Sequence, residues 1–415
     1  MHISSVSSWH ATARALVATG LVVATGAGAR ASGQERARSV TLAAALAAAG
    51  RAPELRAATL RTAAASASVG ASGGLPPTSL SIGTTSATAR AIVTASVPLP
   101  VFGTLGANVR VARADVEVAR AEQRTGAIDL RLRVTSAWIE LAGAQERATL
   151  LASSAERGAA LATVARRRFE EGDSPRTDAV SAAAAAARSA AAARAAGSGL
   201  AAASATLAGL LGWDPTQPLH ADPGLAEPEP LGALATLVSR ARTRPSVHLA
   251  EARSHFAGAQ ADEASRARWP ELSLEGEADI ADPTLPGTEV RGSLAISLPL
   301  FSGLGDAQRA AEIRHDAALA DLDTERRTAR AEVITAYRRW EAVAIEARAL
   351  AAEVLPATRE AASLSRRAYE EGEATLVSVL EAERSLAEVE MELVGARAAA
   401  ALARAELERA SGGRP

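Results

Sequence analysis

Few side chains in this 415-residue chain are of the types that perform catalysis or hold metals. The sequence has six histidines and no cysteine, which excludes thiolate zinc sites, iron–sulfur clusters and disulfides. His248 and His255 lie seven residues apart, near one face of a helix, but no third metal ligand is close to them. The glycine-rich pieces at 26–28 and 70–73 do not lead from a strand into a helix, as a nucleotide site requires. We therefore expect that the chain is not an enzyme and that it holds neither a metal nor a cofactor.

Acidic residues alternate with apolar or small ones in one short segment. Period-two alternation is typical of a strand with one polar and one apolar face. The same pattern recurs nearby and in the first half of the chain, and it predicts strand pairs at 78–101 and 271–301. The acidic face could line a water-filled lumen or lie on the solvated side of a soluble sheet. It consists of Glu271, Glu275, Glu277 and Asp279.

The N-terminus has the features of an export signal. Arg14 precedes an apolar run at 15–24, and Ala29-Arg30-Ala31 matches an A-x-A cleavage site. We expect residues 1–31 to be a signal peptide and see no later apolar run long enough for a transmembrane helix. The formal net charge of −2 gives no electrostatic basis for binding nucleic acid.

The sequence contains an internal duplication. Arg-Arg-x-(Phe/Tyr)-Glu-Glu-Gly occurs at 166–172 and again at 366–372, 200 residues later. Leu-Pro-Val-Phe at 99–102 returns as Leu-Pro-Leu-Phe at 298–301. The matches keep their order, as expected for repeated structural units. We predict a first repeat at 32–212, a proline-rich linker at 213–231 and a second repeat at 232–412.

Each repeat predicts the same series of elements. A first helix, at about 40–70 or 231–268, is broken at Pro53 or Pro245 and leads into the strand pair. A long helical hairpin follows, at 103–212 or 303–412. Its outgoing helix is expected to be continuous from Gly103 to Phe169 and from Gly303 to Tyr369, about 100 Å each at ~1.5 Å per residue. The hairpins are rich in alanine, which lets antiparallel helices pack closely.

This series of elements predicts a mainly α fold with a small β part. We expect several copies of the chain to assemble and complete the β part. Four strands cannot close a barrel, and a helical hairpin of about 100 Å is no compact domain. Three copies would supply the strands of a twelve-stranded barrel with an open lumen, and their antiparallel coiled-coil hairpins would form a tube. In such a barrel apolar residues face lipid and polar residues face the water inside.

The duplicated plan, the Leu-Pro-x-Phe strand ends and the two Glu-Glu-Gly tips resemble the TolC-type outer-membrane efflux proteins. The resemblance implies a homotrimer with a twelve-stranded barrel in outer-membrane lipid and a periplasmic helical tunnel. It implies the outer-membrane channel of a tripartite efflux or type I secretion system. Such a channel passively conducts substrates from a periplasmic adaptor and an inner-membrane pump, of RND or ABC type, to the exterior. The expected adaptor-docking tips are Phe169, Glu170, Glu171, Gly172, Tyr369, Glu370, Glu371 and Gly372.

The resemblance also implies a periplasmic gate. The family's two acidic positions after the second tip fall on Ser378 and Glu381, so one acid is kept, and the first-half aspartate falls on Asp178. The tyrosine that latches neighbouring hairpins falls on Tyr369. Its arginine partner falls on Ala374, and Arg176 could substitute. Alternatively, Glu381 is a surface acid paired with Arg384, three residues on.

Two other protein classes remain as alternatives. A periplasmic adaptor of the same machines also carries a helical hairpin, but usually one, flanked by β-rich domains. A trimeric surface adhesin would have parallel stalk helices and a C-terminal barrel. The two hairpins, with a strand pair inside each repeat, favour the channel over both.

Overall fold

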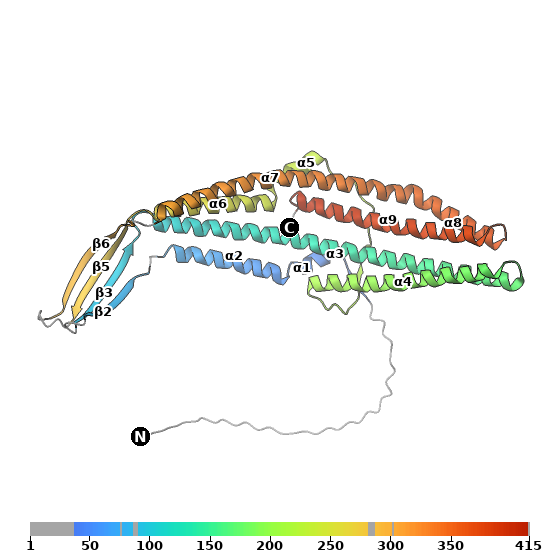
Figure 1. Cartoon of the computed structure of the whole chain (residues 1–415), viewed down its shortest axis with the longest axis horizontal. Helices are drawn as coiled ribbons and strands as arrows, with labels where there is room; N and C mark the ends of the chain where they lie inside the picture. The colour runs from blue at the N-terminus through green and yellow to red at the C-terminus, as the bar shows by residue number, and fades with distance from the viewer. Residues whose placement is uncertain (1–36, 75–76, 86–89, 281–286, 301–302, 414–415) are drawn as a thin grey trace, which may run out of the picture. The chain divides into compact units, whose positions relative to one another are not determined.

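The computed structural model describes residues 37–74, 77–85, 90–280, 287–300 and 303–413, which are mainly helical with a small sheet (Figure 1). The predicted mainly α fold with a small β part is therefore confirmed. The predicted signal peptide at 1–31 lies outside the described residues, and so does Phe301 of the second Leu-Pro-x-Phe motif. In the described part of the chain, helices, a strand pair, an outgoing helix and a return helix follow one another twice.

The first half contains β1 (Arg38–Val40), α1 (Leu42–Ala49), α2 (Pro53–Ser72), β2 (Ser79–Thr85), β3 (Arg90–Leu99), α3 (Thr104–Glu171) and α4 (Arg176–Leu211). The second half follows β4 (Leu219–Ala221). It contains α5 (Leu234–Arg240), the 3₁₀ turn η1 (Ala241–Thr243), α6 (Pro245–Arg266), β5 (Glu271–Ile280), β6 (Glu289–Ser297), α7 (Leu304–Ala349), the π turn η2 (Leu350–Val354), α8 (Leu355–Glu370) and α9 (Leu376–Ala410).

Prolines divide the leading helices where the sequence predicts. Pro53 and Pro245 each occupy the first turn of a helix, and the preceding Ala52 and Arg244 are extended. The missing N–H of proline costs nothing in a first turn, whereas the residue before it is kept out of the helical region. The short strands β1 and β4, which were not predicted from the sequence, form a parallel pair beside α1.

The four strands β2, β3, β5 and β6 form one antiparallel sheet in the order β2-β3-β5-β6. The central pair joins the two halves of the chain, because β3 from the first half is hydrogen-bonded to β5 from the second. Strands β2 and β6 are the two edges of this sheet, and neither has a second neighbour among the described residues.

The register gives the sheet one apolar and one polar face. Ile82, Val93, Ala278 and Val290 form one cross-strand row, and the rows above and below it on that face are also apolar or small. The neighbouring row, on the opposite face, consists of Ser81, Thr94, Glu277 and Arg291. Successive side chains of a strand point to opposite faces, so the alternation predicted from the sequence is realised in all four strands.

The outgoing helices of the two hairpins differ. Helix α3 is continuous over 68 residues, a length of about 100 Å at ~1.5 Å per residue. The prediction of an equally continuous helix from Gly303 to Tyr369 is wrong, because α7 passes into η2 and then α8. Pro356 lies in the first turn of α8. Proline has no N–H and its ring clashes with the carbonyl four residues earlier, and the wider π turn accommodates both effects.

Small side chains fill narrow seams between the helices. Helix α3 packs against α4 within its hairpin and against α9 of the other hairpin, and α9 packs against α7 and α8 (Figure 1). Trp138 is buried on α3, where its indole N–H donates to the Val40 carbonyl at 3.0 Å. Tyr337 and Trp340 pack together on α7. These aromatic side chains therefore serve the packing of the helices.

Candidate functional site

The polar face of the sheet carries the acidic residues that the sequence singled out. Glu271, Glu275, Glu277 and Asp279 all occupy alternate positions of β5, on the face opposite to the apolar rows. Asp279 is buried and forms an ion pair with Arg291 of β6, which also lies 3.6 Å from Glu289. Among the side chains that the structure describes, this face therefore carries acidic residues and Arg291, an arrangement suited to a water-filled, cation-attracting surface.

The far ends of both hairpins are built in the same way. Gly172 and Gly372 each have φ +85°, a left-handed conformation that glycine adopts without strain. In the first tip the Asp173 N–H donates to the Arg168 carbonyl at 2.8 Å, and in the second the Glu373 N–H donates to the Ala368 carbonyl at 2.7 Å. These bonds satisfy the last carbonyls of the outgoing helices.

The aromatic side chains of the two tips differ in exposure. Phe169 is 40% exposed, whereas its counterpart Tyr369 is 1% exposed. Phe169 lines a surface groove of about 430 Å³ with Arg176 and Val180 of α4. The first tip thus presents an aromatic side chain and an arginine to the surroundings, and the second tip buries its aromatic residue.

Arg168 on α3 holds the second tip against the first hairpin. Its guanidinium donates to the Tyr369 carbonyl at 2.6 Å and lies 4.9 Å from the centre of the Tyr369 ring. Among the described residues, the arginine in contact with Tyr369 is Arg168. Arg176, expected as a substitute for the lost latch partner, lies on the groove beside Phe169, and its latch role stays a prediction. A signal was available, because Arg168 has no counterpart in the second repeat, where Ala368 stands.

The Tyr369 hydroxyl is buried and has no hydrogen-bond partner in the described part of the chain. Burial raises the pKa of Tyr369, Arg168 lowers it by a smaller amount, and the nearby carboxylate of Asp178 raises it again. The structure therefore brings Asp178, Arg168 and Tyr369 together, and the hydroxyl stays protonated at physiological pH.

The two residues expected to form the gate after the second tip have different surroundings. Ser378 takes part in the cap of α9, where its backbone N–H donates to the Thr375 hydroxyl at 3.3 Å. Glu381 is exposed and forms no ion pair with another described residue. Arg384 instead pairs with Glu388 at 2.7 Å, so the expected alternative pair of Glu381 and Arg384 is not formed here. Glu381 lines a groove of about 960 Å³ whose walls come from α3, α4 and α9.

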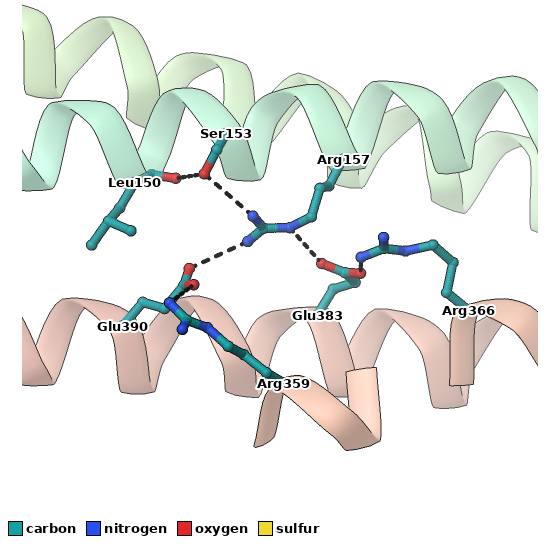
Figure 2. A network of polar contacts seen from close by, with 7 residues as sticks. All are labelled: Leu150, Ser153, Arg157, Arg359, Arg366, Glu383 and Glu390. Atoms are coloured by element: carbon teal, nitrogen blue, oxygen red, sulfur yellow. Dashed lines mark hydrogen bonds and ion pairs between the residues drawn. The ribbon is translucent and has the colours of Figure 1, made fainter. Parts of the chain in front are cut away.

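A network of charged side chains joins the two hairpins between the tips and the middle of α3 (Figure 2). Arg157 of α3 donates to Glu383 at 3.0 Å and to Glu390 at 3.4 Å, both on α9. Two arginines of α8 complete it: Arg359 binds Glu390 at 3.3 Å, and Arg366 binds Glu383. Arg157, Glu383 and Glu390 are largely buried, with side-chain exposures of 22%, 16% and 7%. We call these five residues the hairpin clamp.

No group of three or more histidine or acidic side chains in the described ranges could hold a metal ion. Of the two histidines noted in the sequence, His248 lies 3.1 Å from Glu251 through its Nδ1 atom. In the described ranges, no helix is apolar over a sufficient length to cross a membrane.

Comparison with known proteins agrees with this architecture. The sequence model of the outer membrane efflux protein family matches residues 42–213 and 237–413. No curated protein sequence matches the chain significantly.

The fold is similar to those of solved outer-membrane proteins. The outer-membrane channel OprN has a TM-score of 0.77 and 21% identity, over 90% of each chain. CusC, described with its transmembrane channel formation, has a TM-score of 0.77 and 20% identity, over 90% of this chain and 92% of CusC. The outer membrane protein VceC of Vibrio cholerae has a TM-score of 0.76 and 20% identity, over 90% of this chain and 96% of VceC.

The two matched segments each span a leading helix, a strand pair and a helical hairpin, the arrangement built twice in the structure. A periplasmic adaptor, the alternative kept open by the sequence, is excluded by this match. The chain belongs to the outer membrane efflux protein family, and it is an outer-membrane efflux channel with a periplasmic helical part.

Proposed function

We propose that three copies of this chain form one continuous channel across the outer membrane and the adjoining periplasm. The observation that carries this proposal is the four-stranded sheet, which has an apolar face and a polar face. Its two edges, β2 and β6, lack a second neighbour among the residues that the structure describes. Unpaired strand edges are not tolerated in lipid, so β2 of one copy must pair with β6 of the next. Three such sheets make a twelve-stranded barrel with the acidic face inside.

The hairpin tips are proposed to dock a periplasmic adaptor, which connects the channel to an inner-membrane pump of RND or ABC type. Six tips would form a ring at the periplasmic end, and Phe169 and Arg176 of each first tip would be available for contact. Glu381 is proposed to narrow the entrance, because it is exposed and carries an uncompensated charge in the described part of α9. Asp178 and Tyr369 would join the hairpins near it.

Cysteine cross-linking tests the assembly on a background that contains no native cysteine. Ser81→Cys in β2 is combined with Ser293→Cys in β6, and neighbouring serine pairs cover other registers. Within one chain β3 and β5 separate these strands by roughly 14 Å, since adjacent strands lie ~4.8 Å apart. A disulfide cannot span that distance, so any cross-link joins two copies.

Oxidised membranes should contain covalent trimers of the double-cysteine variants. Each single-cysteine variant is the matched control and can form at most a covalent dimer. If every register tried gives only monomers without a cross-link, the proposed barrel is contradicted.

A further inference from the structure

A basic and aromatic groove lies where the sheet meets the helices. It has a volume of about 420 Å³ and is lined by Val101, Phe102 and Arg110 from the start of α3 and the segment before it, and by Arg266 and Trp269 from the end of α6 and the segment after it. Phe102 and Trp269 stack with their ring centres 5.9 Å apart. The groove therefore combines two guanidinium groups with a pair of stacked rings.

The two arginines are available to bind an anion. Arg266 makes no side-chain hydrogen bond or ion pair with another residue in the described ranges. Arg110 lies 3.7 Å from Asp262, with exposures of 49% and 66% for the two side chains. Such an exposed ion pair contributes little to stability, so an anionic ligand can easily replace Asp262 beside Arg110. No carboxylate of the described ranges lines the groove.

The groove continues the apolar face of the sheet. Leu99, Leu272 and Ile296 form a cross-strand row at the helical end of that face, and Val101 and Trp269 follow within three residues of it. Val101 is 58% exposed and Trp269 49% exposed. Large apolar side chains in such a position are stabilised by acyl chains, and aromatic residues such as tryptophan gather at the level of lipid headgroups.

We propose that this groove binds an anionic phospholipid of the periplasmic leaflet. The headgroup phosphate would lie between Arg110 and Arg266, and the acyl chains would run past Trp269 onto the apolar face of the sheet. The charge of the groove selects the phosphate, since basic pockets at a membrane surface bind anionic headgroups. The leaflet follows from the fold, because the periplasmic helices begin at this groove. The inference uses the orientation given by the proposed barrel.

Native mass spectrometry of the intact protein in detergent tests the site, because one spectrum reports subunit number and bound lipid separately. Phosphatidylglycerol is the anionic probe and phosphatidylethanolamine the zwitterionic one. Phosphatidylglycerol should bind in up to three copies per trimer and more tightly than phosphatidylethanolamine. The double variant Arg110→Gln, Arg266→Gln should weaken binding about tenfold, which corresponds to ~1.4 kcal/mol.

The matched control is Arg124→Gln with Arg314→Gln, which removes two exposed arginines away from the groove. It should bind phosphatidylglycerol like the unchanged protein. If the double variant of the groove does not assemble, Arg266→Gln alone carries the comparison. A separate arm with Trp269→Ala should also weaken phosphatidylglycerol binding, because the ring contacts the chains.

Two results would overturn the proposal. One is equal phosphatidylglycerol binding by the groove variant and the control. The other is competition by inorganic phosphate as strong as that by phosphatidylglycerol, which would make the groove a site for free anions. A failure of the proposed trimer would be visible in the subunit mass, independently of either result.

Discussion

Arg157 on α3 and Glu383 on α9 are 226 residues apart in the sequence, yet the arginine Nε–H donates to the carboxylate at 3.0 Å. The bond connects the first hairpin to the return helix of the second. Because Arg157 also reaches Glu390, a single guanidinium fixes two turns of α9 against α3. The clamp thus restrains how far the second hairpin can move relative to the first.

Replacing Arg157 by glutamine should loosen this connection. Glu383 and Glu390 keep Arg366 and Arg359, so neither carboxylate is left unpaired, and the loss is limited to about 2 kcal/mol for hydrogen bonds to charged groups. We expect a lower melting temperature and a higher mean conductance in planar bilayers. Arg120→Gln, which removes an exposed pair with Glu117, is the control. Unchanged conductance in Arg157→Gln would show that the clamp does not restrain the entrance.

The contact between Arg168 and Tyr369 predicts an effect on conductance for one substitution and none for another. Arg168→Gln removes the cation over the ring and the bond to the Tyr369 carbonyl, so it should raise the conductance of the resting channel. Tyr369→Phe removes only a buried hydroxyl that has no partner in the described residues, so conductance should not change. If Tyr369→Phe opens the channel, the hydroxyl must be bonded to a neighbouring subunit.

The sequence predicted the elements better than the contacts between them. Pro53, Pro245 and the tip glycines specify their structures locally, and strand alternation determined the two faces of the sheet. The π turn before Pro356 was missed although the proline marks it in the sequence, because the helical pattern continues on both sides of Pro356. Strands β1 and β4, with three residues each, are too short to show alternation.

The clamp could not be predicted, because all its candidates look alike in the sequence. The hairpins carry many exposed arginines and glutamates, and helical periodicity does not say which of them meet across 226 residues. Burial separates the members of the clamp from the rest, and burial depends on how α3 and α9 are packed. The docking tips and Glu381 remain predictions, since they concern partners outside this chain.

The two tip glycines should tolerate no β-branched residue. At φ +85° a valine is strained, and it would alter the turn that presents the tip. Gly172→Val and Gly372→Val should each abolish efflux from cells while leaving trimers in the membrane. Gly199→Val in α4, where a new Cβ meets no atom within 4 Å, is the control. Normal efflux in both tip variants would contradict the docking role.

Acid should destabilise the junction between α6 and α7. Burial by itself would raise the pKa of Glu325. The hydrogen bonds from Arg244 and Ser246, together with the positive charges of Arg244 and Arg409, outweigh burial and lower the pKa below its ordinary value. A lowered pKa means that the ionised carboxylate stabilises the fold above the ordinary pKa, and that this stabilisation is lost as the pH falls through the folded value. Arg244 is the buried partner, 2.6 Å from Glu325.

The melting temperature should therefore fall less between pH 7 and acid in Glu325→Gln than in the unchanged protein. Glu360→Gln, at an exposed position of α8, should keep the full acid dependence. The same acid dependence in all three proteins would show that Glu325 does not contribute to the loss of stability in acid.

Glu381 is the strongest candidate for a residue that narrows the periplasmic entrance. It is exposed on α9 and has no ion pair in the described part of the chain, whereas Glu388, seven residues later, is compensated by Arg384. Three symmetry-related carboxylates near one axis would repel each other, attract cations and discourage anions. Glu381→Gln should therefore lower the cation preference of the channel, on the order of twofold, and weaken block by divalent cations. Glu388→Gln removes the same charge from the same face and should have little effect on either property. Single-channel recordings in planar bilayers with unequal salt measure both, and equal effects of the two substitutions would show that Glu381 acts only as general surface charge.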